Sequence, residues 1–230
     1  MKTIGLLGGM SWESTVSYYR AINSGIKDQL GGFHSSKLAL YSVDFAEIET
    51  LQSQGDWQQA GVILAQAAQA VEAAGADFFL IGTNTMHKVA AQAEAAVSIP
   101  LLHIADATAA QLKADGVERV GLLGTRFTME QDFYKGRLTD KHGIRVLVPD
   151  ENAQDVVHRV IYEELCQGKI SDSSRKAYVK IIEDLSAGGA QAVILGCTEI
   201  ALLVSQSDTA IPLYDTTAIH ATAAVKLALA

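Results

Sequence analysis

Short apolar runs alternate with longer amphipathic stretches along the whole chain. The amphipathic stretches, about 11 to 20 residues each, have the periodicity of helices, and the apolar runs between them have the length of strands. We predict strands near 3–8, 37–43, 77–82, 100–103, 119–123, 144–148, 191–195 and 211–214. We predict helices over 12–30, 56–74, 85–97, 105–115, 128–142, 152–166, 173–187 and 216–229. This alternation is typical of βα units that build a parallel sheet.

The pattern also repeats once along the chain. Three segments recur in the same order, and each second copy begins 116, 114 or 112 residues after the start of the first. The pairs are Ile4–Gly8 with Val120–Gly124, Gly75–Thr85 with Gly189–Glu199, and Ile99–Leu101 with Ile211–Leu213. One match among apolar strands could arise by chance, but three in order at nearly one period indicate a duplicated module.

A duplicated module predicts an α/β fold of two pseudo-symmetric, Rossmann-like lobes with parallel sheets. We expect the first lobe over 1–100, with 209–230 returning to it, and the second over 101–208. The chain should cross between lobes near 99–104 and return near 207–211. Ligands of open parallel sheets bind beyond the carboxyl ends of the strands, so we expect the active site in the cleft between the lobes.

Composition narrows the class of protein. With 230 residues, 49% apolar and 19% charged, the chain can bury a sizeable core, as a cytoplasmic enzyme does. Its N-terminus lacks a signal-peptide pattern, and no run approaches the roughly 18 apolar residues of a membrane span. A net charge of −8 argues against a nucleic-acid partner, which would need a basic stripe. We therefore expect no membrane and no nucleic-acid partner.

The two cysteines, Cys166 and Cys197, are too few for a disulfide framework, so each is judged by its setting. Cys197 ends an apolar strand and is followed by Thr198 and Glu199, which places its thiol at the start of a short predicted helix. A helix N-terminus favours a thiolate, so we predict a lowered pKa and a catalytic role for Cys197. The alternative is a buried core cysteine, which we predict for Cys166 in its amphipathic helix.

The repeat aligns Thr83 with Cys197, so a hydroxyl is expected to confront the ligand from the face opposite the thiol. A hydroxyl cannot replace a thiolate as a base, because its proton leaves far above neutrality without an activating neighbour. We predict that Thr83 is catalytic at this position. The alternative is a hydroxyl that only caps the following helix.

Several polar residues near the same strand ends are candidates for substrate binding. Asn84, Thr85 and Thr198 offer backbone N–H groups and side-chain donors that suit a carboxylate or a developing oxyanion. Thr125, which follows the second glycine-containing strand, is a further candidate. Helix capping is the alternative for these residues, and the two roles are compatible.

No cofactor site is indicated by the sequence. The glycine-containing segment Gly5–Ser11 has neither the spacing of a dinucleotide fingerprint nor the Lys-Ser/Thr of a phosphate-binding loop. The six histidines show no ligand pair at close spacing, so we expect no metal. His87 and His220 lie near strand ends, and we interpret them as structural histidines.

Three motifs together resemble those of the aspartate/glutamate racemase family, and its amino-acid racemase branch in particular. They are Gly8-Gly9-Met10-Ser11, Thr83-Asn84-Thr85-Met86-His87 and Gly196-Cys197-Thr198-Glu199-Ile200. The resemblance covers the whole chain. It implies two pseudo-symmetric lobes, a homodimer, and racemisation without pyridoxal phosphate, in which cysteines on opposite faces remove and return the α-proton.

The resemblance also implies roles for individual residues. Cys197 would be the base that takes the α-proton from the L-enantiomer. Gln52 looks like the position that contacts the distal carboxylate, where aspartate-selective relatives carry an arginine. The α-carboxylate and ammonium region would be held by Met10, Asn84, Thr85 and Thr198. Thr83 is the departure, because the typical family member has its first cysteine there.

The sequence thus predicts a racemase that interconverts L- and D-forms of acidic amino acids, with Cys197 as the base and Thr83 opposite it. One alternative is a single-cysteine lyase or isomerase of the same superfamily, similar to arylmalonate decarboxylases or maleate isomerases. Another is a binding or regulatory protein that kept the fold after losing a cysteine. The Thr198-Glu199 pair favours the racemase.

Overall fold

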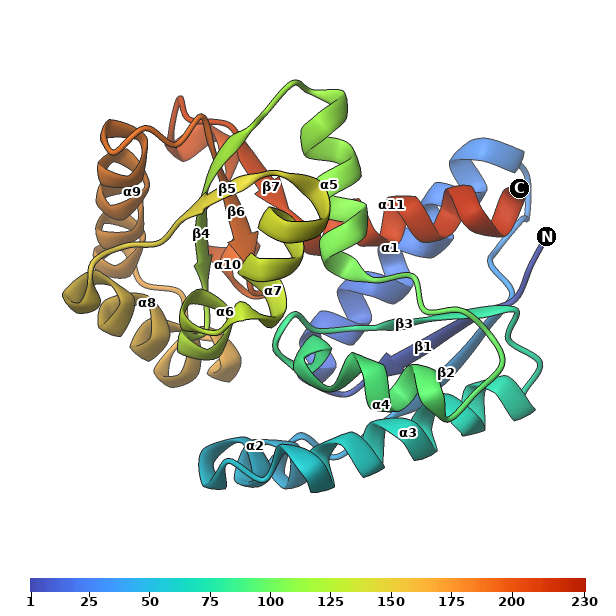
Figure 1. The fold of residues 1–230 in the computed structure, drawn as a ribbon. Helices are drawn as coiled ribbons and strands as arrows, with labels where there is room; N and C mark the ends of the chain where they lie inside the picture. Colours follow the sequence, from blue (N-terminus) through green and yellow to red (C-terminus); the bar gives the residue numbers. More distant parts are fainter. The chain divides into compact units, whose positions relative to one another are not determined.

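The computed structural model describes residues 1–230, which form two α/β units (Figure 1). Unit 1 comprises Met1–Ile104 and Thr217–Ala230, and unit 2 comprises Ala105–Thr216. The chain therefore returns to unit 1 later than the predicted 207–211. The reason is that the last strand, β7 (Leu213–Asp215), pairs with a strand of unit 2.

Unit 1 is built on a parallel sheet in the order β2-β1-β3. Its strands are β1 (Ile4–Gly8), β2 (Leu38–Ser42) and β3 (Phe78–Ile81), and a parallel bridge joins Phe79 to Leu101 beyond β3. Its helices are α1 (Trp12–Leu30), α2 (Phe45–Gln54), α3 (Trp57–Ala73), α4 (Ala90–Ala95) and α11 (Thr216–Leu229), and a 3-10 turn covers Thr85–Val89.

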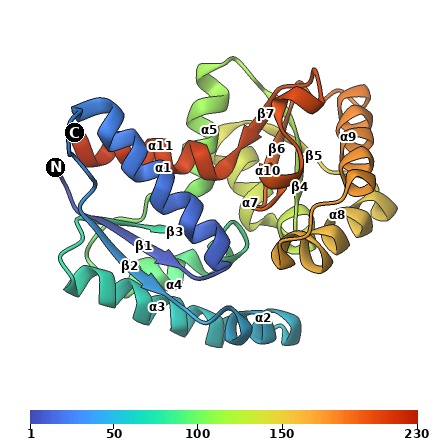
Figure 2. The same ribbon diagram turned by 180° about the vertical axis from the view of Figure 1, so that it is seen from behind.

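Helices cover both faces of this sheet, because its central strands are apolar on both faces. Ile4 and Leu6 of β1 pack with α1 and α11, whereas Leu7 packs with α2, α3 and α4. Helices α1 and α11 come from opposite ends of the chain and lie side by side on one face (Figure 1 and Figure 2). The sheet thereby holds its strand ends on a rigid, two-sided core.

Unit 2 repeats this plan with a parallel sheet in the order β5-β4-β6-β7. The other strands are β4 (Arg119–Gly124), β5 (Arg145–Leu147) and β6 (Ala192–Gly196). The helices are α5 (Ile104–Ala114), α6 (Arg126–Glu130), α7 (Asp132–Gly136), α8 (Glu151–Glu163), α9 (Asp172–Ala187) and α10 (Ile200–Leu203). Shorter turns are a π-helix at Arg137–Lys141 and 3-10 turns at Leu165–Gln167 and Gln206–Asp208. Helices α8 and α9 pack on Leu123, Val193 and Leu195.

The duplication is confirmed by the way each unit packs a helix on its central strand. A Cβ on Gly5 of β1 would lie 2.9 Å from Val71 of α3, and one on Gly121 of β4 would lie 2.9 Å from Leu185 of α9. Glycine at both positions lets the helix approach the sheet closely. The repeated segments therefore perform the same structural task in both units.

The structure corrects several predicted helices. Helix α2 was not predicted. The Asp44 side chain caps its first turn by accepting a hydrogen bond from the N–H of Ala46, and Gly55 ends it in a left-handed conformation. The predicted helix 128–142 is divided, because Gln131 is extended between α6 and α7. The predicted helix 152–166 ends at Glu163. No helix of the structure is long and apolar enough to cross a membrane.

Candidate functional site

The loop after β1 is packed closely against its surroundings. Gly9 has φ +90°, and a Cβ there would lie 2.2 Å from the carbonyl oxygen of Val43, so only glycine fits. Its N–H donates to Oγ1 of Thr15 at 2.8 Å, and Ser11 caps α1. The Met10 side chain is 3% exposed and belongs to the apolar core. The structure therefore gives Met10 a packing role, and its contact with substrate stays a prediction.

The turn after β3 presents Thr83 in a half-buried position. Its hydroxyl makes no hydrogen bond within the protein, and the 3-10 turn that follows has no side-chain cap, so capping is not its role. Its carbonyl oxygen instead accepts a hydrogen bond from Nδ1 of His87 at 2.8 Å. The hydroxyl of Thr83 is thus available to a ligand, while its main chain is anchored.

Three predicted binding residues lie together around this turn. Asn84 and Thr85 are buried within it. Gln52, near the end of α2, is 5% exposed and its Nε2 lies 3.1 Å from Sδ of Met86, the next residue along the turn. The unpredicted helix α2 therefore brings Gln52 beside the Thr83 turn, which the sequence alone could not show.

The turn after β6 pairs Cys197 with a carboxylate. Cys197 is half-buried, and its Sγ donates to Oε2 of Glu199 at 2.9 Å. The hydroxyl of Thr198 donates to the same oxygen at 2.7 Å. Glu199 is only 4% exposed, so a buried carboxylate accepts hydrogen bonds from a half-buried thiol and a half-buried hydroxyl. Glu199 is a candidate functional residue that the sequence analysis treated only as part of a motif.

The predicted lowering of the Cys197 pKa is wrong. Burial raises the pKa of this thiol well above its usual value, and the negative charge of Glu199 raises it further. Helix α10 cannot offset these effects, because it has four residues and Glu199 itself precedes its first residue. In the resting protein Cys197 is therefore a thiol, hydrogen-bonded to a carboxylate, rather than a preformed thiolate.

Two other candidates have structural roles in unit 2. Thr125 is buried and caps α6, accepting a hydrogen bond from the N–H of Thr128 at 3.4 Å. Cys166 packs on the same apolar core as Cys197, and its charge would add to the raised pKa of that thiol. Its half-buried position in this core agrees with the predicted packing role.

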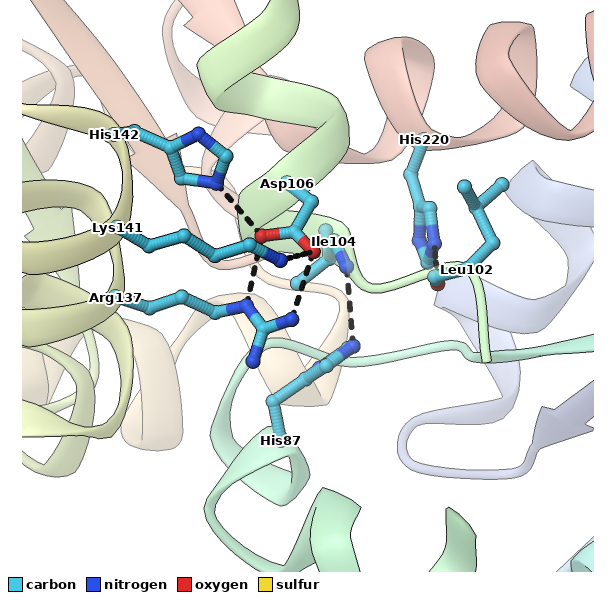
Figure 3. A network of polar contacts seen from close by, with 8 residues as sticks. All are labelled: His87, Leu102, Ile104, Asp106, Arg137, Lys141, His142 and His220. Atoms are coloured by element: carbon cyan, nitrogen blue, oxygen red, sulfur yellow. Dashed lines mark hydrogen bonds and ion pairs between the residues drawn. The ribbon is translucent and has the colours of Figure 1, made fainter. Parts of the chain in front are cut away.

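A separate polar cluster in unit 2 surrounds Asp106 of α5. Its carboxylate accepts two hydrogen bonds from Arg137, at 2.8 and 2.7 Å, and one each from Lys141 and His142, both at 2.8 Å (Figure 3). Burial opposes the charge of Asp106, but these partners outweigh it and hold the pKa of the carboxyl well below its usual value. No group of three or more His, Cys, Asp or Glu in the structure could hold a metal ion.

The chain is similar to known racemases in sequence and in fold. The family model described as Asp/Glu/Hydantoin racemase matches residues 7–224. The chain is 22% identical to the broad specificity amino-acid racemase RacX of Bacillus subtilis, over 99% of this chain and 98% of that protein. A crystal structure from Yersinia pestis, provisionally assigned as an Asp/Glu racemase, is 59% identical with a TM-score of 0.94. An aspartate racemase homologue from Pyrococcus horikoshii is 34% identical with a TM-score of 0.85. Both structures are matched over 100% of each chain.

Proposed function

Because this chain belongs to the Asp/Glu/hydantoin racemase family, we propose that it racemises acidic amino acids without a cofactor, with Cys197 as the base for the L-enantiomer. The single observation that carries this proposal is the 2.9 Å contact between Sγ of Cys197 and the buried carboxylate of Glu199. That contact provides an acceptor for the thiol proton, and a catalytic thiol with a raised pKa requires one.

We propose the following proton balance. The thiol proton of Cys197 moves to Glu199, and the thiolate then takes the α-proton of the L-substrate while the C–H electron pair remains on the substrate as an enediolate. The substrate's ammonium group favours the thiolate, because an opposite charge lowers a thiol pKa. On the other side of the α-carbon, Thr83 supplies a proton directly or through one water. After the product leaves, water returns a proton to Thr83 and Glu199 releases its proton to water, so each group recovers its starting state and no net proton is gained or lost.

The polar residues of the two turns suit an acidic substrate. We propose that Met10, Asn84, Thr85 and Thr198 hold the α-carboxylate and ammonium region, with Thr125 as a further contact. Gln52 would hold the distal carboxylate by hydrogen bonding. Because its amide is neutral, it attracts this carboxylate less than an arginine would. We also propose that the protein is cytoplasmic and forms a homodimer. Light scattering of the purified protein tests the dimer.

A lyase or isomerase is the second candidate function. The observation that favours it is Thr83, which leaves Cys197 as the single cysteine at the two equivalent strand ends. Such an enzyme would release carbon dioxide from a substituted malonate or isomerise maleate, and it would leave amino acids unchanged.

Incubation in D2O separates these functions. L-Glu, L-Asp and their D-forms are incubated with the purified protein, and α-deuteration and chirality are measured together. The racemase predicts deuterated product of inverted configuration, with exchange faster from the L-form than from the D-form. Net kcat/KM must still be equal in both directions, because the equilibrium constant of a racemase is one. Turnover of a malonate or of maleate without α-exchange of any amino acid would overturn the proposal.

A further inference from the structure

The ring of His87 contacts the main chain through both of its nitrogens (Figure 3). Nδ1 lies 2.8 Å from the carbonyl oxygen of Thr83, and Nε2 accepts the N–H of Ile104 at 3.3 Å. A carbonyl can only accept and an amide N–H can only donate, so Nδ1 carries the hydrogen and Nε2 has none. The two contacts together therefore specify a neutral ring in one tautomer.

His220 has the opposite arrangement in the same unit. Its Nε2 lies 2.7 Å from the carbonyl oxygen of Leu102, and its Nδ1 lies 2.8 Å from the hydroxyl of Tyr18. The carbonyl requires hydrogen on Nε2, so Nδ1 accepts from the tyrosine. Burial lowers the pKa of His220 to about 4, which agrees with a neutral ring. We call His87 and His220 the histidine clamp, since they hold Ile104 and Leu102.

The clamp connects two parts of unit 1. Leu102–Ile104 is the segment by which the chain leaves this unit, and Thr83 begins the turn after β3. Figure 3 shows His87 rising from that turn toward Ile104. The duplicated turn in unit 2 has Ala201 at the position of His87, so it has no equivalent anchor. The anchoring is therefore particular to the side of the molecule that carries Thr83.

We infer that His87 is a positioning residue that fixes the main chain of Thr83, and hence the direction of its hydroxyl, from the exit segment of unit 1. The inference rests on the proposed role of Thr83 as the proton donor. The hydroxyl has no hydrogen bond of its own within the protein, so its position depends on the direction of the Cα–Cβ bond, and the main chain that His87 anchors sets that direction. Misplacement of a proton-transfer group by about 1 Å can cost up to about 10²-fold in rate.

Three substitutions separate the two contacts of His87. His87→Asn places an amide nitrogen near the position of Nδ1 and keeps a donor for Thr83, whereas His87→Gln reaches Ile104 and loses that donor. His87→Ala loses both. In D2O, we expect the Ala and Gln variants to lose about tenfold in kcat for exchange of the D-form, with KM and L-form exchange within about threefold. His87→Asn should recover most of the loss.

The outcomes decide the inference as follows. Equal rates for His87→Asn and His87→Ala, or equal losses from both enantiomers in variants with unchanged melting temperature, would overturn it. If the Ala variant does not fold, the comparison of Asn with Gln decides the matter.

Nitrogen NMR of the histidine rings tests the clamp without using activity. We expect hydrogen on Nδ1 of His87 and on Nε2 of His220 at neutral pH. Any other state of His87 would overturn the inference even in an active enzyme. The expected tautomers in a protein that exchanges no amino acid would instead overturn the proposed function, and with it the catalytic meaning of the clamp.

Discussion

The two units present the same turn but fix different parts of it. After β6, the side chain of Cys197 is held by the carboxylate of Glu199. After β3, the main chain of Thr83 is held by the imidazole of His87, and its side chain is left without a partner. A thiol that must act as a base needs an acceptor for its own proton, whereas a hydroxyl that gives a proton to the substrate must point at the α-carbon and can be reprotonated by water. The difference between the turns therefore matches the different chemistry proposed for each.

The largest effect should come from removing the thiol. Cys197→Ser should lower racemisation of L-Glu and L-Asp by at least about 10³-fold, because a serine hydroxyl is a far weaker base. Its melting temperature should stay close to that of the wild type. The matched control is Cys166→Ser, which should change the rate little because that residue packs in the core. Full activity in a folded Cys197→Ser protein would remove the thiol from the mechanism.

The second effect concerns stability below neutral pH and compares a buried histidine of unit 1 with a half-buried carboxylate of unit 2. The pKa of His220 is lowered from 6.5 to about 4. Between these pH values His220 is therefore protonated in the unfolded chain and neutral in the folded protein. Its contribution is complete above pH 6.5 and is lost as the pH falls toward 4, in total about 3 kcal/mol. Urea unfolding across this range should show the decline, and His220→Gln should flatten it.

The matched control for this stability effect lies in unit 2. Asp106 has a lowered pKa, so the stability that its ion pairs contribute is complete above its usual pKa of 3.8 and is lost only as the pH falls below that value. Asp106→Asn should lower the free energy of unfolding by about 2 kcal/mol at pH 7 and leave the decline between pH 6.5 and 4 unchanged. An equal decline in the wild type and in His220→Gln would show that other groups cause it.

The third effect separates the two influences of Glu199 on the thiol. Glu199→Gln removes the negative charge that raises the Cys197 pKa, so the pKa should fall and iodoacetamide should alkylate Cys197 faster at a given pH. The same change removes the proton acceptor, so racemisation should slow by about 10²-fold. Both are measured in a Cys166→Ser background, where Cys197 is the single thiol. Faster alkylation without slower racemisation would leave Glu199 with no role as an acceptor.

The sequence was sufficient for the parts of this molecule that repeat. The strands Ile4–Gly8 and Val120–Gly124, and the strand ends before Thr83 and Cys197, followed from the duplication, because each copy supports the assignment of the other. Helix α2 has no counterpart among the three repeated segments and was missed. The contact between Gln52 and Met86 was missed for the same reason, because Gln52 lies on this helix.

The sequence was insufficient for the electrostatics of the site. The start of a helix after Cys197 suggested a lowered pKa, but the result depends on which way the Glu199 side chain turns. It turns back to the thiol, and its charge and the burial of the group outweigh a four-residue helix. His87 was interpreted as a structural histidine, which agrees with its two main-chain contacts, but no pattern shows that its nitrogens contact residues 4 and 17 positions away.

The smallest expected effect tests whether the two turns can be made alike. Thr83→Cys places a thiol of lower intrinsic pKa where the hydroxyl now lies, so exchange of the D-form in D2O should rise about fivefold. The gain should be modest because this turn has Thr85 where the other has Glu199, and the new thiol would have no carboxylate to accept its proton. Thr83→Cys combined with Thr85→Glu should therefore exceed the single variant. Thr83→Val serves as the control of similar shape and should lose D-form exchange. Two results would break the comparison: wild-type exchange of the D-form as fast as the L-form, or a folded Thr83→Cys protein whose D-form exchange is unchanged.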